Sequence, residues 1–203
     1  MAAHDSPASE NSTLFVVAVA CSAGGLVALR RFVSLLPGRL PAAVVLLQHL
    51  SPDHPSHLLP LLQPSTSMPV KEARRGAVLR EGVVYVATPN RHVLIEPGPV
   101  LGTSFAERVQ FVRPSANVLF ESLAVTCGDH AIAVVLTGSG SDGAAGIRRV
   151  KARGGTVIAQ DEATSQHFGM PHAAIETGCV DLILPLDDIP PAISHLLSES
   201  KRQ

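Results

Sequence analysis

Residues 14–25, LFVVAVACSAGG, place an unbroken apolar run directly before a serine and a pair of glycines. A continuous apolar run of this kind is typical of a β-strand that is covered on both faces. Apolar side chains then recur at helical spacing, at Leu26, Leu29, Val33 and Leu36. The Pro-Gly pair at residues 37–38 ends that helix, and a second apolar run, AAVVLLQ, follows at residues 42–48. The order strand, helix, strand predicts a βαβ unit of a parallel sheet.

The rest of the chain repeats this alternation after an interruption. A buried strand is predicted at residues 131–137, a short strand at 156–159 and a final strand at 180–184. Helices are predicted from about residue 115, over 144–153, from Pro171 to about Gly178, and from Asp188 onward. Between the two parts, residues 83–87 and 92–96 flank Thr-Pro-Asn-Arg and predict an antiparallel hairpin, while residues 98–114 predict loop with a short strand. We therefore expect an α/β fold, a doubly wound and mainly parallel sheet with an antiparallel hairpin insertion.

Composition limits the class of protein. Apolar residues make up 46% of the 203 residues and charged residues 16%, which favours one compact domain over 14–198, with a disordered tail at 1–13 and a short tail at 199–203. The net charge is −1 and basic residues do not cluster, so we expect no nucleic-acid partner. Neither a secretory signal nor an apolar run near 20 residues is present. Three widely spaced cysteines fit reduced thiols, so we expect a cytoplasmic protein without membrane insertion.

Three predicted strands are followed by residues that suggest catalysis. Ser22 follows the first strand, His49 the second, and Asp142 lies in the loop after the strand that ends at residue 137. Ligands of open parallel sheets bind at the carboxyl ends of the strands. If these strands are neighbours, Ser22 is a nucleophile, His49 its base and Asp142 the group that orients the imidazole. Backbone N–H groups after Ser22 and in the loop 138–140 would then form an oxyanion hole.

Each residue also has a simpler interpretation. The turn around Ser22 has the geometry of a phosphate-binding loop, although Gln48-His49 stands where a dinucleotide site needs an acid. Asp142 is compatible with a cap for the following helix. His49 lies near Asp53, His54 and His57, but this spacing matches no common metal site. Cys21, at the end of a buried strand, fits a core thiol. The order serine, histidine, acid also disfavours an ordinary α/β-hydrolase, in which the histidine comes last.

With those residues in view, the chain resembles the catalytic domain of the chemotaxis protein-glutamate methylesterases. The resemblance runs from residue 14 to about residue 193 and rests on ACSAGG, LLQHL, VVYVATPNRHV, RPSANVLFESLA, VVLTGSGSDGAAG and AQDEATSQHFGMPHAAIETG. It implies hydrolysis of γ-glutamyl methyl esters on the cytoplasmic helices of chemoreceptors, with release of methanol, and in many members deamidation of receptor glutamines. It implies no metal or organic cofactor.

The resemblance also assigns roles to residues. It places the family's serine, histidine and aspartate on Ser22, His49 and Asp142. It implies further site residues, which contribute to the oxyanion site or line the cleft: Ala23, Ser139, Gly140 and Arg113. Departures from the family pattern are an alanine at residue 23 in place of a threonine, a serine at 139 in place of a common methionine, and Asn117 in place of a frequent aspartate.

Only 13 residues precede the first predicted strand, too few for the receiver domain that usually covers the active site in this family. The resemblance then implies one of three things: an ungated enzyme, an enzyme controlled by a separate partner, or a relative of the domains found fused to receptor methyltransferases. Its expected partners therefore include a receptor methyltransferase or a separate response regulator. Two other functions stay open from the residues alone. One is a catalytically weak docking module of a chemosensory complex, and the other is a phosphate- or nucleotide-binding module.

Overall fold

The structure, a computed structural model, describes residues 14–49 and 57–200. The tail predicted at residues 1–13 lies outside the described residues, as do the last three residues of the chain. At the carboxyl end, the helix α6 (Ile189–Ser200) continues through residues 199 and 200, which the sequence pattern places in a tail. No helix in the described part of the chain has the length and the apolar character needed to cross a membrane.

The centre of the fold is a seven-stranded sheet in which every neighbouring pair is parallel. The strand order is β3-β4-β2-β1-β7-β8-β9. In chain order, the strands are β1 (Phe15–Cys21), β2 (Ala42–Gln48), β3 (Val70–Glu72), β4 (Val84–Val86), β7 (Ala131–Val135), β8 (Thr156–Gln160) and β9 (Leu182–Leu184). The predicted fold class is confirmed, and β1 lies in the middle of the sheet between β2 and β7.

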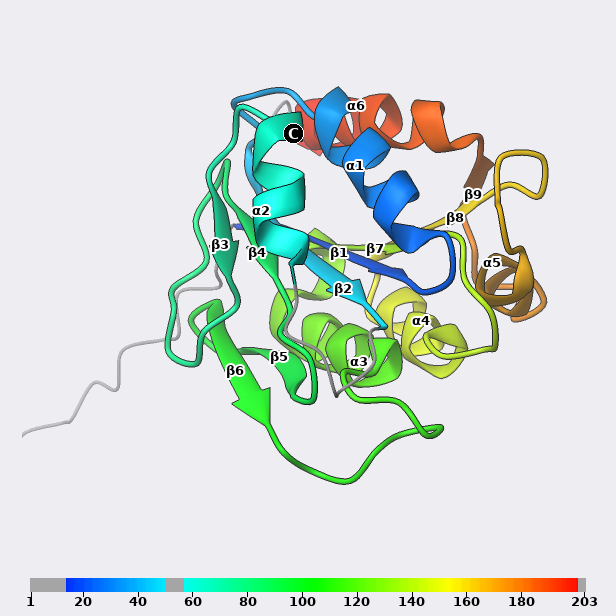
Figure 1. Ribbon diagram of the computed structural model, residues 1–203, viewed down its shortest axis with the longest axis horizontal. Helices are drawn as coiled ribbons and strands as arrows, with labels where there is room; N and C mark the ends of the chain where they lie inside the picture. The colour runs from blue at the N-terminus through cyan, green and yellow to red at the C-terminus, as the bar shows by residue number, and fades with distance from the viewer. Residues whose placement is uncertain (1–13, 50–56, 201–203) are drawn as a thin grey trace, which may run out of the picture.

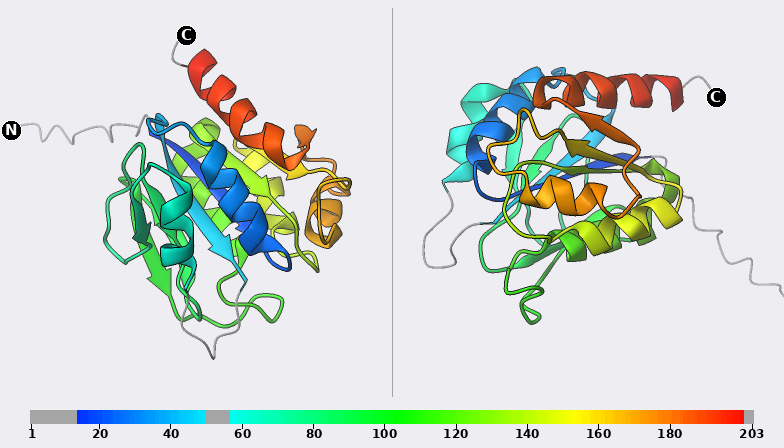
Figure 2. Two further views of the ribbon diagram at one scale, coloured as in Figure 1. Left: turned by 45° about the horizontal axis from the view of Figure 1, so that its top comes forward. Right: turned by 90° about the vertical axis from the view of Figure 1, so that its right-hand side faces the viewer.

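Helices cover both faces of this sheet, as Figures 1 and 2 show. One face carries α1 (Gly25–Leu35), α2 (Leu58–Leu62) and α6; the other carries α3 (Ala116–Cys127), α4 (Ala144–Ala152) and α5 (Gly169–Ile175). Short 3-10 helices are η1 (Gln63–Ser65), η2 (Gly128–His130) and η3 (Leu186–Asp188). Along β1, Val17 and Val19 face one core and Val16 and Ala18 the other. This two-sided burial explains why the strand is apolar at every position.

The hairpin that we predicted from residues 83–87 and 92–96 is wrong. Residues 84–86 form β4, which lies between β2 and β3 in the parallel sheet. The antiparallel pair is formed instead by β5 (His92–Glu96) and β6 (Val100–Ser104), in a separate two-stranded sheet beside α3. All three residues of β4 are buried, which suits a strand covered on both faces rather than a hairpin with one wet face. A turn with Gly98 at φ 84 joins β5 to β6.

The order of the strands creates a switch point beside β1. The chain runs from β1 to β2 on one side, and later returns through β7 on the other side. Segments that follow β1, β2 and β7 therefore meet at the carboxyl edge of the sheet, where ligands of doubly wound folds bind.

Candidate active site

Ser22 is fixed at this carboxyl edge by the backbone of both neighbouring segments. Its N–H donates to the carbonyl of Thr137 (3.0 Å), and the N–H of His49 donates to the carbonyl of Cys21 (3.0 Å). The helix α1 starts immediately afterwards, with Gly24 in the left-handed region at φ 76. The turn thus places a half-buried serine between the ends of β2 and β7.

Glycine at residue 138 allows the β7 loop to approach this serine. A Cβ at that position would lie 2.9 Å from the Cβ of Ser22 and 3.0 Å from its backbone nitrogen. Thr137 ties the same region together, because its hydroxyl is within hydrogen-bonding distance of the carbonyls of Ala23 (3.1 Å) and His167 (3.2 Å) and accepts from the N–H of His167 (2.9 Å). The serine turn is therefore braced by the loop between β8 and α5.

His49 and Asp142 form the polar pair of the site. Nε2 of His49 lies 2.9 Å from Oδ2 of Asp142, and the two side chains are only 10% and 5% exposed. Because an ionised carboxylate only accepts, Nε2 carries the hydrogen and Nδ1 is left as the basic nitrogen of the neutral ring. No hydrogen bond among the described residues joins Ser22 to His49. Hydrogen bonds of this kind are often long or absent until substrate binds.

The carboxylate of Asp142 lies at the amino end of α3. It accepts from the hydroxyl of Ser115 (2.8 Å) and from the N–H groups of Ala116 (2.5 Å) and Asn117 (3.1 Å). Burial alone would raise the pKa of Asp142, but hydrogen bonds from His49, Ala116, Ser115 and Asn117 outweigh it and lower the pKa. Asp142 is therefore an ionised acceptor that holds one orientation of the imidazole.

The capping interpretation of Asp142 is corrected by this geometry. The carboxylate caps α3, which precedes it in the chain, whereas the N–H groups of Gly143 (3.0 Å) and Gly146 (2.8 Å) of the following helix donate to the amide oxygen of Asn117. The residues that start the two helices thus cap each other.

His92 belongs to the same network and has no counterpart among the residues predicted from the sequence. Its Nδ1 accepts from the N–H of Ser115 (3.2 Å), and Nε2 lies 3.0 Å from the carbonyl of Glu107, where it must donate. The ring is only 1% exposed. It positions Ser115, which in turn holds Asp142. A buried histidine in β5 has no local signature, and only the contact with residues 107 and 115 reveals its role.

The predicted oxyanion residues lie around Ser22. Within the described residues, no hydrogen bond uses the backbone N–H of Ala23, Ser139 or Gly140. Ser139 and Gly140 are exposed, and Gly140 has φ 90. The residue types at 23 and 139 differ from the family pattern, but backbone donors survive such changes.

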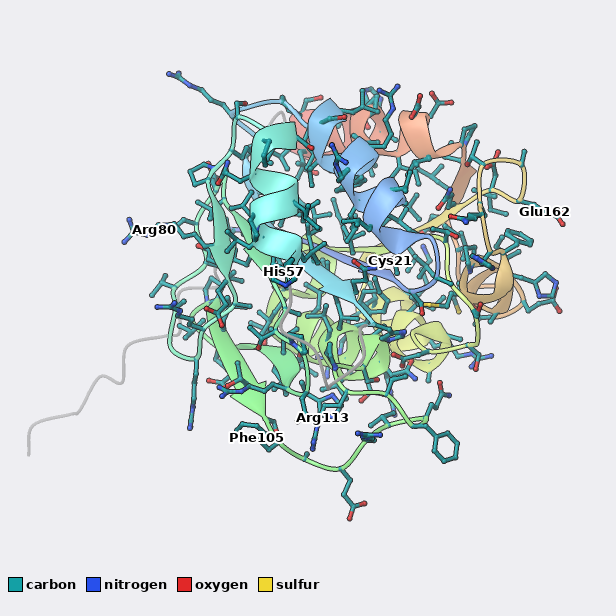
Figure 3. The ribbon with its side chains drawn as sticks, in the orientation of Figure 1. Cys21, His57, Arg80, Phe105, Arg113 and Glu162 are labelled. Carbon is teal, nitrogen blue, oxygen red and sulfur yellow. The ribbon has the colours of Figure 1, made fainter. Side chains whose placement is uncertain are left out.

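Arg113 has a structural task in this chain. Its guanidinium donates to the side-chain oxygen of Asn90 from Nε (3.1 Å) and Nη2 (2.6 Å), and from Nη1 to the carbonyls of Phe105 (2.8 Å) and Ala106 (3.0 Å). Most of its N–H groups are therefore engaged in holding the loop between β6 and α3, and Figure 3 shows Arg113 and Phe105 on the same rim of the molecule.

The interpretation of Cys21 as a competing nucleophile weakens once the geometry is known. Cys21 is fully buried (labelled in Figure 3), and burial raises the pKa of its thiol, so it is a poor nucleophile. Of the suggested metal ligands, Asp53 and His54 lie outside the described residues. The described part of the chain holds no group of three or more residues arranged to bind a metal.

A serine, a histidine and a carboxylate at the switch point of a doubly wound sheet define the class: an α/β protein with the residue types of a serine hydrolase. The family model described as CheB methylesterase matches residues 17–193. The chain therefore belongs to the CheB methylesterase family, as its sequence motifs predicted.

Individual relatives agree with this assignment. Over 187 residues the chain is 42% identical to a protein-glutamate methylesterase/protein-glutamine glutaminase of Moorella thermoacetica, covering 90% of this chain and 44% of that protein. A putative enzyme of the same description from Leptospira interrogans is 37% identical over 173 residues, covering 85% and 90%. The crystal structure of the Thermotoga maritima CheB methylesterase catalytic domain matches with a TM-score of 0.88 at 34% identity, covering 91% of this chain and 99% of that one. The chain thus spans about half of the Moorella relative and most of the Leptospira one.

Proposed function

We propose that the chain hydrolyses γ-glutamyl methyl esters on the cytoplasmic helices of chemoreceptors and acts in the cytoplasm. A methylated receptor helix would be its substrate and principal partner, and a receptor methyltransferase or a separate response regulator would control it. Glutamine deamidation, the second activity in the names of its relatives, uses the same acyl chemistry.

The proposed reaction assigns one task to each residue. The Ser22 oxygen attacks the ester carbonyl while His49 takes its proton, and N–H groups of Ala23, Ser139 and Gly140 stabilise the oxyanion. His49 then protonates the departing methoxide, and methanol leaves with cleavage of the carbon–oxygen bond. Water, deprotonated by His49, attacks the acyl-enzyme and restores both the glutamate carboxylate and Ser22.

One observation supports the proposal most strongly: the buried His49–Asp142 pair, with 2.9 Å between Nε2 and Oδ2. The backbone of His49 is hydrogen-bonded to Cys21, the residue before Ser22. A buried carboxylate that is held by three groups of α3 and still bonded to an imidazole suits a base that must keep one tautomer. A purely structural serine turn would not need this pair.

Methanol release from methylated receptor fragments tests the proposal. Ser22→Ala should lower the rate by at least about 1000-fold, because the nucleophile is lost while the fold is kept. Ser34→Ala is a matched control in α1, since its exposed hydroxyl bonds only to the carbonyl of Arg31 within the same helix, and it should retain a rate within about twofold of the wild type. Equal methanol release by Ser22→Ala and wild type would refute the assignment.

A further inference from the structure

The loop between β6 and α3, residues 105–113, is one part of the described surface that the catalytic geometry does not explain. It leaves the body of the molecule at the lower edge of Figure 1 and returns to the start of α3. Phe111 is 93% exposed and Phe105 64% exposed, in a chain with only six phenylalanines. Single exposed apolar residues are common, but two exposed aromatic rings on one loop require a reason.

The backbone at the tip of the loop holds the Phe111 ring in solvent. Val109 and Val112 exchange hydrogen bonds of 3.2 and 3.0 Å, so residues 110 and 111 form a two-residue turn. Gln110 and Phe111 have φ 50 and 67, in the left-handed region that favours glycine and is unusual for a bulky side chain. Strained conformations of this kind gather at functional sites, where the surroundings enforce them.

The loop is also fastened to the catalytic network. The carbonyl of Glu107 accepts from His92, which holds Ser115 and through it Asp142. Arg113 clamps the other limb through the carbonyls of Phe105 and Ala106. These contacts hold the loop 105–113, which we call the platform, in place on the side of the site where Asp142 lies.

The charged residues around the platform indicate the chemistry of the partner that it binds. Arg91 lies over the Phe105 ring at 4.7 Å, and Arg108 is exposed beside the tip, while Glu107 is the single acidic residue of the loop. A surface with exposed aromatic rings and an excess of guanidinium groups suits an acidic, amphipathic helix.

We propose that three side chains on and beside this loop form the docking surface for the acidic helical segment that carries the ester: Phe111 as its apolar anchor, and Arg108 and Arg91 as its cationic contacts. This inference rests on the proposed function, because each hydrolysed glutamyl ester leaves a carboxylate on the substrate segment. Recognition through the platform would set the affinity for the protein substrate without contributing to the chemistry at Ser22.

Two glycine variants of the 203-residue chain separate the effect of the Phe111 ring from the effect of the turn that carries it. Phe111→Gly removes the ring and suits the left-handed backbone, so the turn persists; Gln110→Gly suits the same turn and keeps the ring. We expect Phe111→Gly to raise KM for a methylated receptor fragment about tenfold with little change in kcat, and Gln110→Gly to leave both within about twofold. Hydrolysis of p-nitrophenyl acetate, a small neutral ester, should stay within about twofold in both.

Further variants test the location and the charge. Val125→Ser removes an apolar side chain, 66% exposed, from α3, and should leave KM for the receptor fragment unchanged. Arg108→Glu should raise that KM at low salt and weaken its dependence on ionic strength.

The outcomes distinguish the two proposals. An unchanged KM in Phe111→Gly, or an equal loss on both substrates, overturns the docking surface while the esterase assignment stands. A wild-type chain that cleaves the small ester but releases no methanol from the receptor fragment overturns the proposed function and the docking surface with it.

Discussion

Asp142 is a buried carboxylate whose negative charge is stabilised by hydrogen bonds from four groups: His49, Ala116, Ser115 and Asn117. Removing this charge should therefore change how the stability of the fold depends on pH. The pKa of Asp142 is lower in the folded chain than in the unfolded one, because hydrogen bonds outweigh burial. Its contribution to stability is therefore complete above the unfolded pKa, about 4, and is lost as the pH falls through the lowered folded pKa. The carboxylate then stabilises both the fold and the orientation of His49 at neutral pH.

Asp142→Asn should lower the free energy of unfolding by about 1–3 kcal/mol at pH 7 and reduce methanol release at least about 100-fold. The difference in stability from wild type should shrink below about pH 4. Urea unfolding at pH 7 and pH 3 measures it. Asp129→Asn is the control, since the Asp129 side chain is 79% exposed and should matter little. A stability difference that is the same at both pH values would contradict the assigned role.

Single residues differ in how far the sequence could predict them. Ser22 and His49 closely follow predicted strands, and Asp142 lies in the loop after a third, so general knowledge of parallel sheets was enough to bring them to one edge. His92 lies inside β5, and its bonds reach residues 107 and 115. Contacts of this kind depend on how β5 packs against α3, which no local pattern records.

At the scale of elements, the helices α3 and α4 depend on each other. The amide oxygen of Asn117 accepts from Gly143 and Gly146, and the Asp142 carboxylate accepts from the first turn of α3. Gly146 also allows close packing, since a Cβ there would lie 2.7 Å from the Cβ of Phe120 and 3.0 Å from the backbone of Asn117. The two helices should therefore lose stability together.

Asn117→Ala should destabilise the chain by about 1–3 kcal/mol, because two buried N–H groups lose their acceptor. Asn117→Asp keeps an acceptor oxygen and should cost less, although its charge lies near Asp142. Thermal unfolding of the two variants beside wild type measures both effects. Equal stability of Asn117→Ala and wild type would show that the reciprocal caps carry no net energy.

Whether a helix or strand could be predicted from the sequence depended on its length and on how far it is buried. The long apolar runs of β1, β2 and β7 and the periodic pattern of α3 were predicted nearly as observed. β3 has three residues, of which only Val70 is buried, and was not predicted. β4 was assigned to the wrong partner, because a short apolar run beside Thr-Pro-Asn-Arg fits a hairpin and a buried parallel strand equally well.

At the scale of the whole molecule, strand order brings the segments that carry three separate residues to one edge of the sheet. The predicted site requires that the strands before Ser22, His49 and Asp142 be neighbours, and the order β2-β1-β7 meets that condition. Order in a sheet is set by packing of both faces over the whole domain, so local sequence patterns leave it open. Side chains of β1 belong to both hydrophobic cores. Exposure of this strand to solvent should therefore require unfolding of the whole domain.

The central position of β1 predicts the order in which the cysteine thiols react with a labelling reagent. Cys21 is fully buried at the carboxyl end of the central strand, whereas Cys127 and Cys179 are both half-buried. Burial raises the pKa of the Cys21 thiol, and it raises that of Cys127 to about 12. Iodoacetamide at pH 8 should therefore modify Cys179 first and Cys127 more slowly, and Cys21 only at the rate of global unfolding, which urea accelerates. Mass spectrometry of labelled peptides follows each site, and Cys21→Ala should lack the slowest phase. Methanol release should survive modification of Cys179; labelling of Cys21 in the native chain as fast as Cys179 would show that the central strand opens locally, not with the whole fold.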